Sequence, residues 1–360
     1  MKRTAIFTLI SVLTLSTLIA CSIPNKTYSY SLNDKESTVI NTLFNESATY
    51  CLGRYTFEYP QALTQELSSI TTIDEITIES KPIYPPAFKH RIELKETELI
   101  NKRVSEASDA PFLKEVIRLD NGVIFDHNED YNKPDSARVL EAHIYINDVA
   151  FIITTKLKDL TKPKYSSRRI VYEKHNQPIF NKPQKLAAMK SLISRLQGRP
   201  KGEIPTTKGI CIPNGFIADD GGKHKEKLSM LFKNNQFVWA IVLNNIVESE
   251  NESLLERASE INRVMRQHGA STLKKGNLKY NDIFAEEWLI SGEEKNSNDT
   301  LDKYYRFQYN VNEKNVTYLT PLIEILLHNS TRVVKDYSDD QMIEIWDRVL
   351  QSFKVRPHAF

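Results

Sequence analysis

Three cysteines, at positions 21, 51 and 211, are the residues of this chain best suited to covalent chemistry. Cys51 lies in the stretch YCLGRYTFEYP, where it could be a nucleophile, a metal ligand or half of a disulfide. A catalytic thiolate needs an electropositive, partly open setting. Tyr55, Phe57 and Tyr59 alternate with polar residues, so we expect one strand from Cys51 to Pro60 with Arg54 on the face opposite Cys51. Cys51 is therefore expected to be a structural residue.

Motifs that serve catalysis, phosphate binding or metal binding are absent from the sequence. It contains no Gly-x-Ser-x-Gly, no His-Glu-x-x-His, no P-loop and no Gly-x-Gly-x-x-Gly. The eight histidines are scattered singly. The acidic stretch FDHNEDYNKPD (125–135) lacks the glycine and the terminal glutamate of a calcium loop. We expect no enzyme activity, no cofactor and no metal.

Two acidic stretches are better interpreted as solvated loops that present charge to a partner. The first contains Asp126, Glu129 and Asp130, and its counterpart SGEEKNSNDTLDK (291–303) contains Glu293 and Glu294. Charges at the rim of an interface accelerate association with an oppositely charged partner. These five carboxylates are our prediction for a partner-binding surface.

The N-terminal residues MKRTAIFTLISVLTLSTLIACS have the layout of an export signal. A basic pair precedes an apolar run that is too short to cross a bilayer, so residues 1–20 are predicted to be a signal peptide. Leu18-Ile19-Ala20-Cys21 resembles the lipobox of bacterial lipoproteins, which predicts lipidation of Cys21; an ordinary cleavable signal is the alternative. Ser22 at the next position favours the outer membrane of a Gram-negative bacterium, facing the periplasm. Residues 21–41 are polar and are predicted to form a flexible tether.

Removal of the signal changes both the charge and the cysteine count. Lys+Arg falls from 48 to 46, which equals the 46 Asp+Glu, so the mature chain is formally neutral and shows no basic character suited to nucleic acid. Cys51 and Cys211 remain, in a compartment that permits disulfides. They either bond to each other or lie separately as buried thiols, because sequence alone does not fix their distance.

Most of the mature chain repeats itself at an offset close to 160 residues. The paired segments are Cys51 and Cys211; ITIES (76–80) and QFVWAIVL (236–243); the helical patterns 91–107 and 252–269; the hairpin patterns 138–157 and 304–326; and two closing helices that run into Arg-Pro at 199–200 and 356–357. The fold class predicted is α+β, with two similar lobes at 42–200 and 201–360, each an antiparallel sheet with packed helices. The stretch LQGRPKGEIPTTKG (196–209) is predicted to be the joint between them.

The chain resembles the two-domain immunity lipoproteins that protect bacteria against type VI secretion lipase effectors of the fourth class. The residues that carry the resemblance are the lipobox, Cys51 to Tyr55 with Pro60, Cys211-Ile212, and Gly215-Phe216-Ile217. The resemblance implies a protein without catalytic activity that binds a secreted phospholipase and blocks it. Two lobes on a joint could grip a protruding part of the enzyme, such as its lid.

The same resemblance marks Gly53, Arg54, Pro60 and Gly215 as framework positions. Gly53 is expected to allow close backbone approach and Arg54 to pair with an acidic neighbour. Two other functions remain open: a structural or assembly lipoprotein of the cell envelope, and a ligand-binding lipoprotein. The second is disfavoured because such proteins are built mainly from parallel sheets, whereas hairpins are predicted here.

Overall fold

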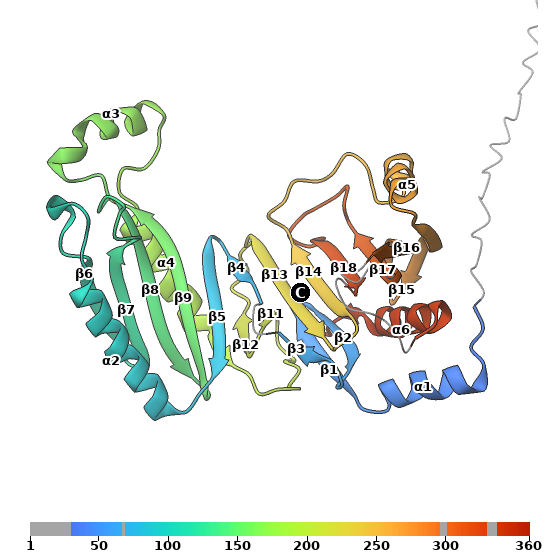
Figure 1. The fold of residues 1–360 in the computed structure, drawn as a ribbon. Coiled ribbons are helices and arrows are strands. Elements are labelled where there is room, and N and C mark those ends of the chain that lie inside the picture. The colour runs from blue at the N-terminus through green and yellow to red at the C-terminus, as the bar shows by residue number, and fades with distance from the viewer. Residues whose placement is uncertain (1–29, 67–68, 296–300, 330–336) are drawn as a thin grey trace, which may run out of the picture.

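The computed structural model describes residues 30–66, 69–295, 301–329 and 337–360 (Figure 1). The predicted signal peptide and Cys21 lie outside these residues. No helix in the described ranges is long and apolar enough to cross a membrane.

The elements of the two halves follow one another in nearly the same order. The first half contains α1 (Asp34–Phe44), β1 (Ser47–Leu52), β2 (Tyr55–Pro60), β3 (Thr64–Gln65), β4 (Thr71–Ile73), β5 (Ile76–Pro82), α2 (Pro85–Asn101), β6 (Leu113–Leu119), β7 (Gly122–Asn128), β8 (Ala137–Ile146), β9 (Val149–Lys158), α3 (Ser166–Lys174), α4 (Lys182–Arg195) and β10 (Leu196–Gly198). The second half contains β11 (Gly209–Ile212), β12 (Gly215–Ala218), β13 (Glu226–Lys233), β14 (Val238–Asn244), α5 (Ala258–Gln267), β15 (Ser271–Tyr280), β16 (Ile283–Lys295), β17 (Leu301–Val311), β18 (Leu322–His328), α6 (Asp339–Ser352) and β19 (Lys354–Val355).

One antiparallel sheet runs through both lobes. Along its main path the strand order is β15-β16-β17-β18-β14-β13-β4-β5-β9-β8-β7-β6, with six equivalent strands from each lobe that meet at β4 and β13 (Figure 1). The short strand β3 of the first half also pairs with β13, beside this path. At this junction Thr72 pairs with Lys227 in antiparallel register. The predicted α+β class with two similar lobes is confirmed, and equivalent strands of the two lobes lie next to each other at the centre.

The last strand of each half completes a small sheet of the other half. β19, at the end of the second half, pairs with β2 in the sheet β1-β2-β19, and β10, at the end of the first half, pairs with β12 in the sheet β10-β12-β11. The predicted boundary between residues 200 and 201 therefore divides the sequence, whereas the packing crosses it.

Two local predictions were wrong. Residues 51–60 form a hairpin instead of one strand, because Gly53 adopts φ of +58° and reverses the chain so that Cys51 pairs with Thr56. The predicted tether is also shorter, because Asn33 caps helix α1: Glu36 N donates to Asn33 Oδ1 (2.9 Å) and Asn33 N donates to the Glu36 carboxylate (3.0 Å). Ile40 of this helix is fully buried in the core.

The two faces of the large sheet differ in what covers them. Strand pairing places Thr77 beside Thr154 and Thr72, Thr72 beside Lys227, and Lys227 beside Asn244, so these side chains share one face of the sheet across both lobes. The opposite face, which we call the core face, carries Ile76, Ile78, Met230 and Ile325 into the main hydrophobic core. Helices α4 and α6 and the two small sheets pack against this core face.

Only the two ends of the first face are covered in the described structure. α2 packs at one end in a cluster with Leu99, Phe112, Val123 and Phe125, and α5 packs at the other with Leu254, Met265 and Trp288. Between them, β13 and β18 alternate strictly between buried and half-buried residues, as expected for strands with one solvent-facing side. We call this exposed central part the open face; it includes Thr72, Thr77, Thr154, Lys227, Val242 and Leu326.

Candidate functional site

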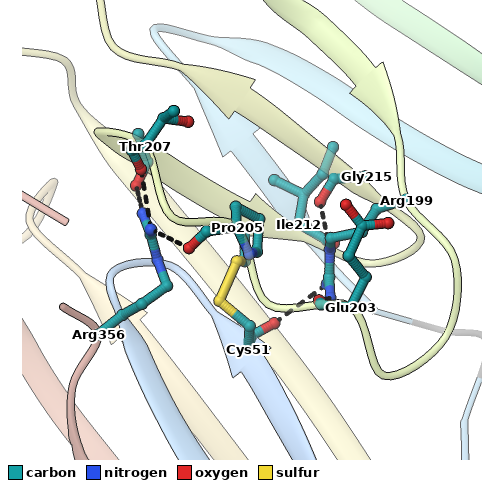
Figure 2. The surroundings of a disulfide bond; sticks show 10 residues. Cys51, Arg199, Glu203, Pro205, Thr207, Ile212, Gly215 and Arg356 are labelled. Carbon is teal, nitrogen blue, oxygen red and sulfur yellow. Dashed lines mark hydrogen bonds between the residues drawn. A yellow bond between two sulfur atoms is a disulfide. The ribbon is translucent and has the colours of Figure 1, made fainter. Parts of the chain in front are cut away.

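A disulfide joins Cys51 of the first lobe to Cys211 of the second (Figure 2). Both residues are fully buried, their S–S distance is 2.00 Å, and they occupy equivalent strands of the two lobes. Beside them, Gly53 N donates to Cys211 O and Cys211 N donates to Gly53 O, each at 2.8 Å. A buried disulfide offers neither a nucleophile nor a metal ligand. Within the described ranges, no group of three or more His, Cys, Asp or Glu side chains is placed to hold a metal ion.

The framework glycines lie where neighbouring side chains approach the backbone closely. A Cβ at Gly53 would lie 2.6 Å from Leu243 Cδ1, and a Cβ at Gly215 would lie 2.9 Å from Phe151 Cε1. Both neighbours belong to other elements of the core, so a larger residue at either position would push the hairpins away from the sheet. Pro60 is the last residue of β2 and pairs with Ser47.

Arg54 bridges the two lobes through a buried ion pair. Its Nη1 lies 2.6 Å from Glu226 Oε2 and its Nη2 lies 2.9 Å from Glu226 Oε1, while Nη2 also donates to the Tyr318 hydroxyl at 2.7 Å. Burial alone would lower the pKa of Arg54, but the hydrogen bonds and charge of Glu226 raise it. The acidic neighbour expected for Arg54 is therefore a residue of the other lobe.

Two equivalent arginines hold the joint through backbone carbonyl groups (Figure 2). Arg199 donates to the carbonyls of Glu203 (2.7 Å), Ile212 (3.1 Å), Gly215 (3.1 Å) and Cys51 (3.3 Å). Arg356 donates to the carbonyls of Pro205 (2.6 Å), Thr207 (2.8 Å) and Gly209 (2.7 Å). Burial lowers the pKa of both guanidinium groups. Sequence analysis missed their role, although the repeated Arg-Pro was the signal for it.

These contacts hold the two lobes together as one rigid body. The predicted joint (196–209) contributes β10 to the small sheet of the second half, and four of its carbonyls accept bonds from the two arginines. The continuous sheet, the disulfide and the Arg54–Glu226 pair cross between the lobes at other points. A surface that spans both lobes is therefore preformed.

The prediction of a first acidic partner-binding loop was wrong for Asp126. Asp126 belongs to β7, is 0 % exposed and points to the core face, where it accepts a hydrogen bond from Arg138 Nε (2.8 Å) and lies 2.6 Å from Lys182 Nζ. Glu129 is half-buried and pairs with Lys133 (2.9 Å) and Lys156 (2.6 Å), whose hydrogen bonds lower its pKa. Asp130 is partly exposed and accepts a bond from Tyr131 N at 2.6 Å. The carboxylates of Asp126 and Glu129 are thus neutralised by cations of the same chain and are not available to a partner.

Glu293 and Glu294 are exposed, at the end of β16 rather than in a loop. They line a groove of about 570 Å³ between α5 and strands β16 and β17. Its wall includes Ile261, Val264 and Ile290, and Val264 is 41 % exposed. These two carboxylates remain a prediction for a partner-binding surface, now with an apolar groove beside them.

The first lobe has a polar surface at the corresponding end of the open face. Glu141 accepts hydrogen bonds from His143 Nε2 (2.7 Å) and His127 Nε2 (3.2 Å), and Lys95 of α2 lies 3.4 Å away. Burial opposes ionisation of Glu141, but the two histidine hydrogen bonds and Lys95 hold its pKa well below the usual range. A hollow of about 550 Å³ adjoins this cluster and is lined by Glu75, Thr77 and Thr154 among others.

Comparisons with known proteins identify the family. Residues 48–199 match the model of the Tle cognate immunity protein 4 N-terminal domain, and residues 203–358 match the model of the Tle cognate immunity protein 4 C-terminal domain. The chain belongs to this family. The resemblance found in the sequence is confirmed. The protein is an immunity protein that neutralises a type VI secretion lipase effector of the Tle class.

Solved structures share the fold of this Tle cognate immunity protein 4 family member. The apo immunity protein TplEi of the type VI secretion system of Pseudomonas aeruginosa is 20% identical with a TM-score of 0.66, covering 87% of this chain and 98% of its own. A chain of the crystal structure of the Tle4–Tli4 complex is 19% identical with a TM-score of 0.67, covering 88% and 99%. TplEi complexed with "L" peptide is 19% identical with a TM-score of 0.63, covering 86% and 98%. A search of curated proteins returned no match.

Proposed function

We propose that this protein binds a type VI secretion phospholipase effector through the open face of its sheet and blocks it without catalysis. The observation that carries the proposal is the continuous sheet that spans both lobes and leaves one face uncovered between α2 and α5. Such a face is usually covered in a single domain, because removing half-buried apolar side chains from water stabilises the fold.

The chemistry of the open face suits a protein partner. Leu231, Val238, Val242 and Leu326 are half-buried on adjacent strands, and charged residues surround them. Among them, the carboxylate of Glu324 makes no hydrogen bond or ion pair within the described part of the chain. Burial raises the pKa of Glu324, the charge of Glu313 adds to the effect, and Arg257 and Lys227 offset part of it. An apolar centre with a polar rim is the usual anatomy of a protein interface, and a partner with a basic group would compensate Glu324.

Inhibition would then follow from rigid occlusion. Because disulfide, arginines and sheet continuity fix the lobes, the open face and the flanking helices α2 and α5 form a preorganised surface, and little affinity is lost to ordering on binding. A protruding element of the enzyme, such as a lid, fits a surface bounded by two helices. The part of the lipase that is held stays a proposal.

The site of action proposed is the periplasmic face of the outer membrane, with Cys21 carrying the lipid. The lipobox supports this location. Tyr30 donates to Glu344 of α6 at 2.5 Å and Leu32 packs against the core, so the proposed tether is limited to residues 21–29, which would reach about 30 Å when extended. Mass spectrometry of the mature N-terminal peptide tests it. A diacylglyceryl-modified Cys21, absent in Cys21→Ala, is expected, and an unmodified N-terminus at another residue would overturn it.

The first test of binding is calorimetric titration of the chain from Ser22 into the lipase encoded beside its gene, with phospholipid hydrolysis followed in parallel. Every described residue follows residue 29, so this form keeps the described fold intact. Nanomolar binding with loss of hydrolysis is expected. If a folded, active lipase does not bind at micromolar concentration, the proposal fails and a structural role in the envelope becomes the better interpretation.

The second test locates the surface. Val242→Lys with Leu326→Lys places two charges on the open face, where long side chains can reach water, and is expected to weaken binding at least 100-fold. The matched control is Val39→Lys. Val39 is also an accessible aliphatic residue, but it lies on α1, which packs behind the core face. Equal affinity of both variants and the natural chain, with unchanged melting temperatures, would exclude the open face.

A further inference from the structure

Helix α3 forms an arm with few contacts to the rest of the described structure, one of which places Lys158 Nζ of β9 3.9 Å from the ring centroid of Tyr172. It extends beyond the ends of β8 and β9, and none of its residues is buried (Figure 1). The arm belongs to the connection 159–181 between β9 and α4, whereas the equivalent connection between β18 and α6, residues 329–338, is much shorter. The second lobe therefore forms the same sheet and closing helix without such an arm, so the fold does not require it.

The side chains of α3 combine exposed aliphatic groups with unpaired cations. Ile170 is 67 % exposed and Val171 is 54 % exposed. Arg168, Arg169 and Lys174 make no ion pair with any described residue, and Glu173 is the single acidic residue of the helix. Exposure of these aliphatic groups to water is unfavourable, and contact with another surface would remove that cost.

The stem of the arm is fixed to the first lobe. Tyr165 donates to Asp135 Oδ1 at 2.5 Å, and Lys164 Nζ lies 2.9 Å from the same oxygen atom. Lys162 also pairs with Asp135. Lysines of the stem are thus neutralised by the protein, whereas the cations of the helix itself are left for an external anion.

We propose that α3 is a membrane-contact arm, which places Ile170 and Val171 at the lipid–water interface while Arg168, Arg169 and Lys174 bind anionic phospholipid headgroups. The proposal rests on the lipidation of Cys21 proposed above. A helix of two turns would bind a bilayer weakly by itself, but a second weak signal stabilises attachment when a lipid chain already holds the protein at the surface.

Two observations favour a bilayer over a protein groove as the partner. The helix is convex and short, and long basic side chains beside aliphatic ones can reach headgroup phosphates while the aliphatic groups enter the acyl boundary. Helix α1, the first described helix after the proposed lipid anchor, also lies at the end of the molecule opposite α3 (Figure 1). With both ends in contact, the molecule would lie along the membrane whose phospholipid the effector attacks.

Because the arm by itself is expected to bind weakly, the test titrates the chain from Ser22, without lipase, with a large excess of lipid at low salt and measures the bound fraction by flotation. The vesicles contain phosphatidylethanolamine and phosphatidylglycerol, or phosphatidylcholine alone. We expect binding to the anionic vesicles that weakens at high salt, and at least fivefold less to the neutral ones. Arg168→Gln with Arg169→Gln and Lys174→Gln, and separately Ile170→Ser with Val171→Ser, are each expected to reduce binding at least fivefold. Because four of these five side chains are exposed and Arg169 is half-buried, both variants should fold normally.

The matched control lies on α5, which also presents exposed cations beside an exposed valine. Arg263→Gln with Arg266→Gln and Val264→Ser should leave vesicle binding unchanged. No binding of the natural chain to anionic vesicles at low salt would overturn the proposal, as would equal losses from the α5 variant. If the α3 variants weaken lipase binding tenfold and leave vesicle binding intact, the arm is a protein-docking element and the membrane proposal is wrong. The lipase titration of the natural chain reports separately on the proposed function.

Discussion

Equivalent places on the core face of the two lobes hold a buried carboxylate that is compensated in opposite ways. In the first lobe, Asp126 of β7 contacts two cations, Arg138 and Lys182, the latter from the closing helix α4. In the second lobe, Glu287 of β16 shares one cation with Asp347 of the closing helix α6: Lys274 Nζ lies 3.0 Å from Glu287 and 2.7 Å from Asp347.

This difference indicates what the repeated fold does and does not depend on. The order of strands, the closing helix and the exchange of β10 and β19 are the same in both lobes, whereas Asp126 contacts two cations and Glu287 and Asp347 share one. Backbone pairing and apolar packing therefore specify the scaffold, and each lobe satisfies its few buried charges with whatever partner is in reach.

The surfaces diverge in the same manner. At the first lobe's end of the open face, Glu141 is hydrogen-bonded by two histidines, so its charge is already satisfied. At the other end, α5 leaves Val264 and the acidic residues Glu293 and Glu294 around an apolar groove. We expect the second lobe to supply most of the binding free energy for a partner, because desolvated apolar anchors contribute more than charges that are already paired.

The largest expected effect comes from separating the lobes. Residues 30–200 produced alone lack β19 for the β1-β2 sheet and expose β4 as an unpaired edge strand, so we expect no cooperative fold. The same chain co-expressed with residues 201–360 should assemble into a native-like complex, because each piece supplies the strand that the other lacks. Circular dichroism and thermal melting of the pieces and of the mixture measure this. A cooperatively folded 30–200 piece would show that the lobes are independent.

A second large effect is expected from the disulfide. Cys51 and Cys211 are 160 residues apart, and closing so long a loop in the unfolded chain stabilises the fold by about 4–5 kcal/mol in the entropic description. Cys51→Ala with Cys211→Ala should therefore lower the free energy of unfolding by roughly that amount in urea titration. Reductant should destabilise the natural chain and leave the double variant unchanged; destabilisation of both would place the effect elsewhere.

The comparison of buried charges predicts a loss in the first lobe. Asp126→Asn replaces the carboxylate that Lys182 and Arg138 share with a neutral amide, so both cations lose a charged partner in a largely buried place. We expect the free energy of unfolding to fall by about 3 kcal/mol at pH 7. Arg138 keeps Asp159 at 2.7 Å, which limits the loss. Urea titration measures it, and Asp126→Asn with Lys182→Met should recover part of the stability. A neutral effect of the single substitution would contradict the ion-pair interpretation.

Much of the scaffold could be predicted from the sequence because its signals are local. Period-two alternation and the Asn147-Asp148 turn predicted the hairpin β8–β9, and the recurrence of Cys51 at Cys211 predicted equivalent strands. Both turn residues have positive φ, as the Asn-Asp pair suggests. Such patterns predict a strand or a turn from residues that are neighbours in the sequence.

The parts that were missed depend on partners far away in the sequence. β10 and β19 are two or three residues long and carry no periodic pattern, so their exchange between the lobes leaves no local signal. Asp126 was assigned to a solvated loop because acidic residues cluster after it, yet Val123, Ile124 and Phe125 just before it are buried and continue the strand. Which surface stays open was also hidden, since half-buried strand residues look alike whether or not a helix covers them.

The smallest and most diagnostic effect is expected at Asp347, which shares its one cation, Lys274, with Glu287. Burial raises the pKa of Asp347 and Lys274 only partly offsets it, so the folded state binds this proton more tightly than the unfolded chain does. Stability therefore falls as the pH rises from the unfolded pKa, near 4, through the higher pKa of the folded state.

Asp347→Asn removes that loss while Lys274 keeps Glu287, so the variant should be more stable than the natural chain by about 1 kcal/mol at pH 7. The gain should shrink as the pH falls toward 4, because protonation of the natural aspartate removes the buried charge. Urea titrations at the two pH values measure it beside Asp126→Asn, whose effect at pH 7 has the opposite sign. If both substitutions destabilise equally at pH 7, the two lobes compensate their buried carboxylates alike and the contrast between them is wrong.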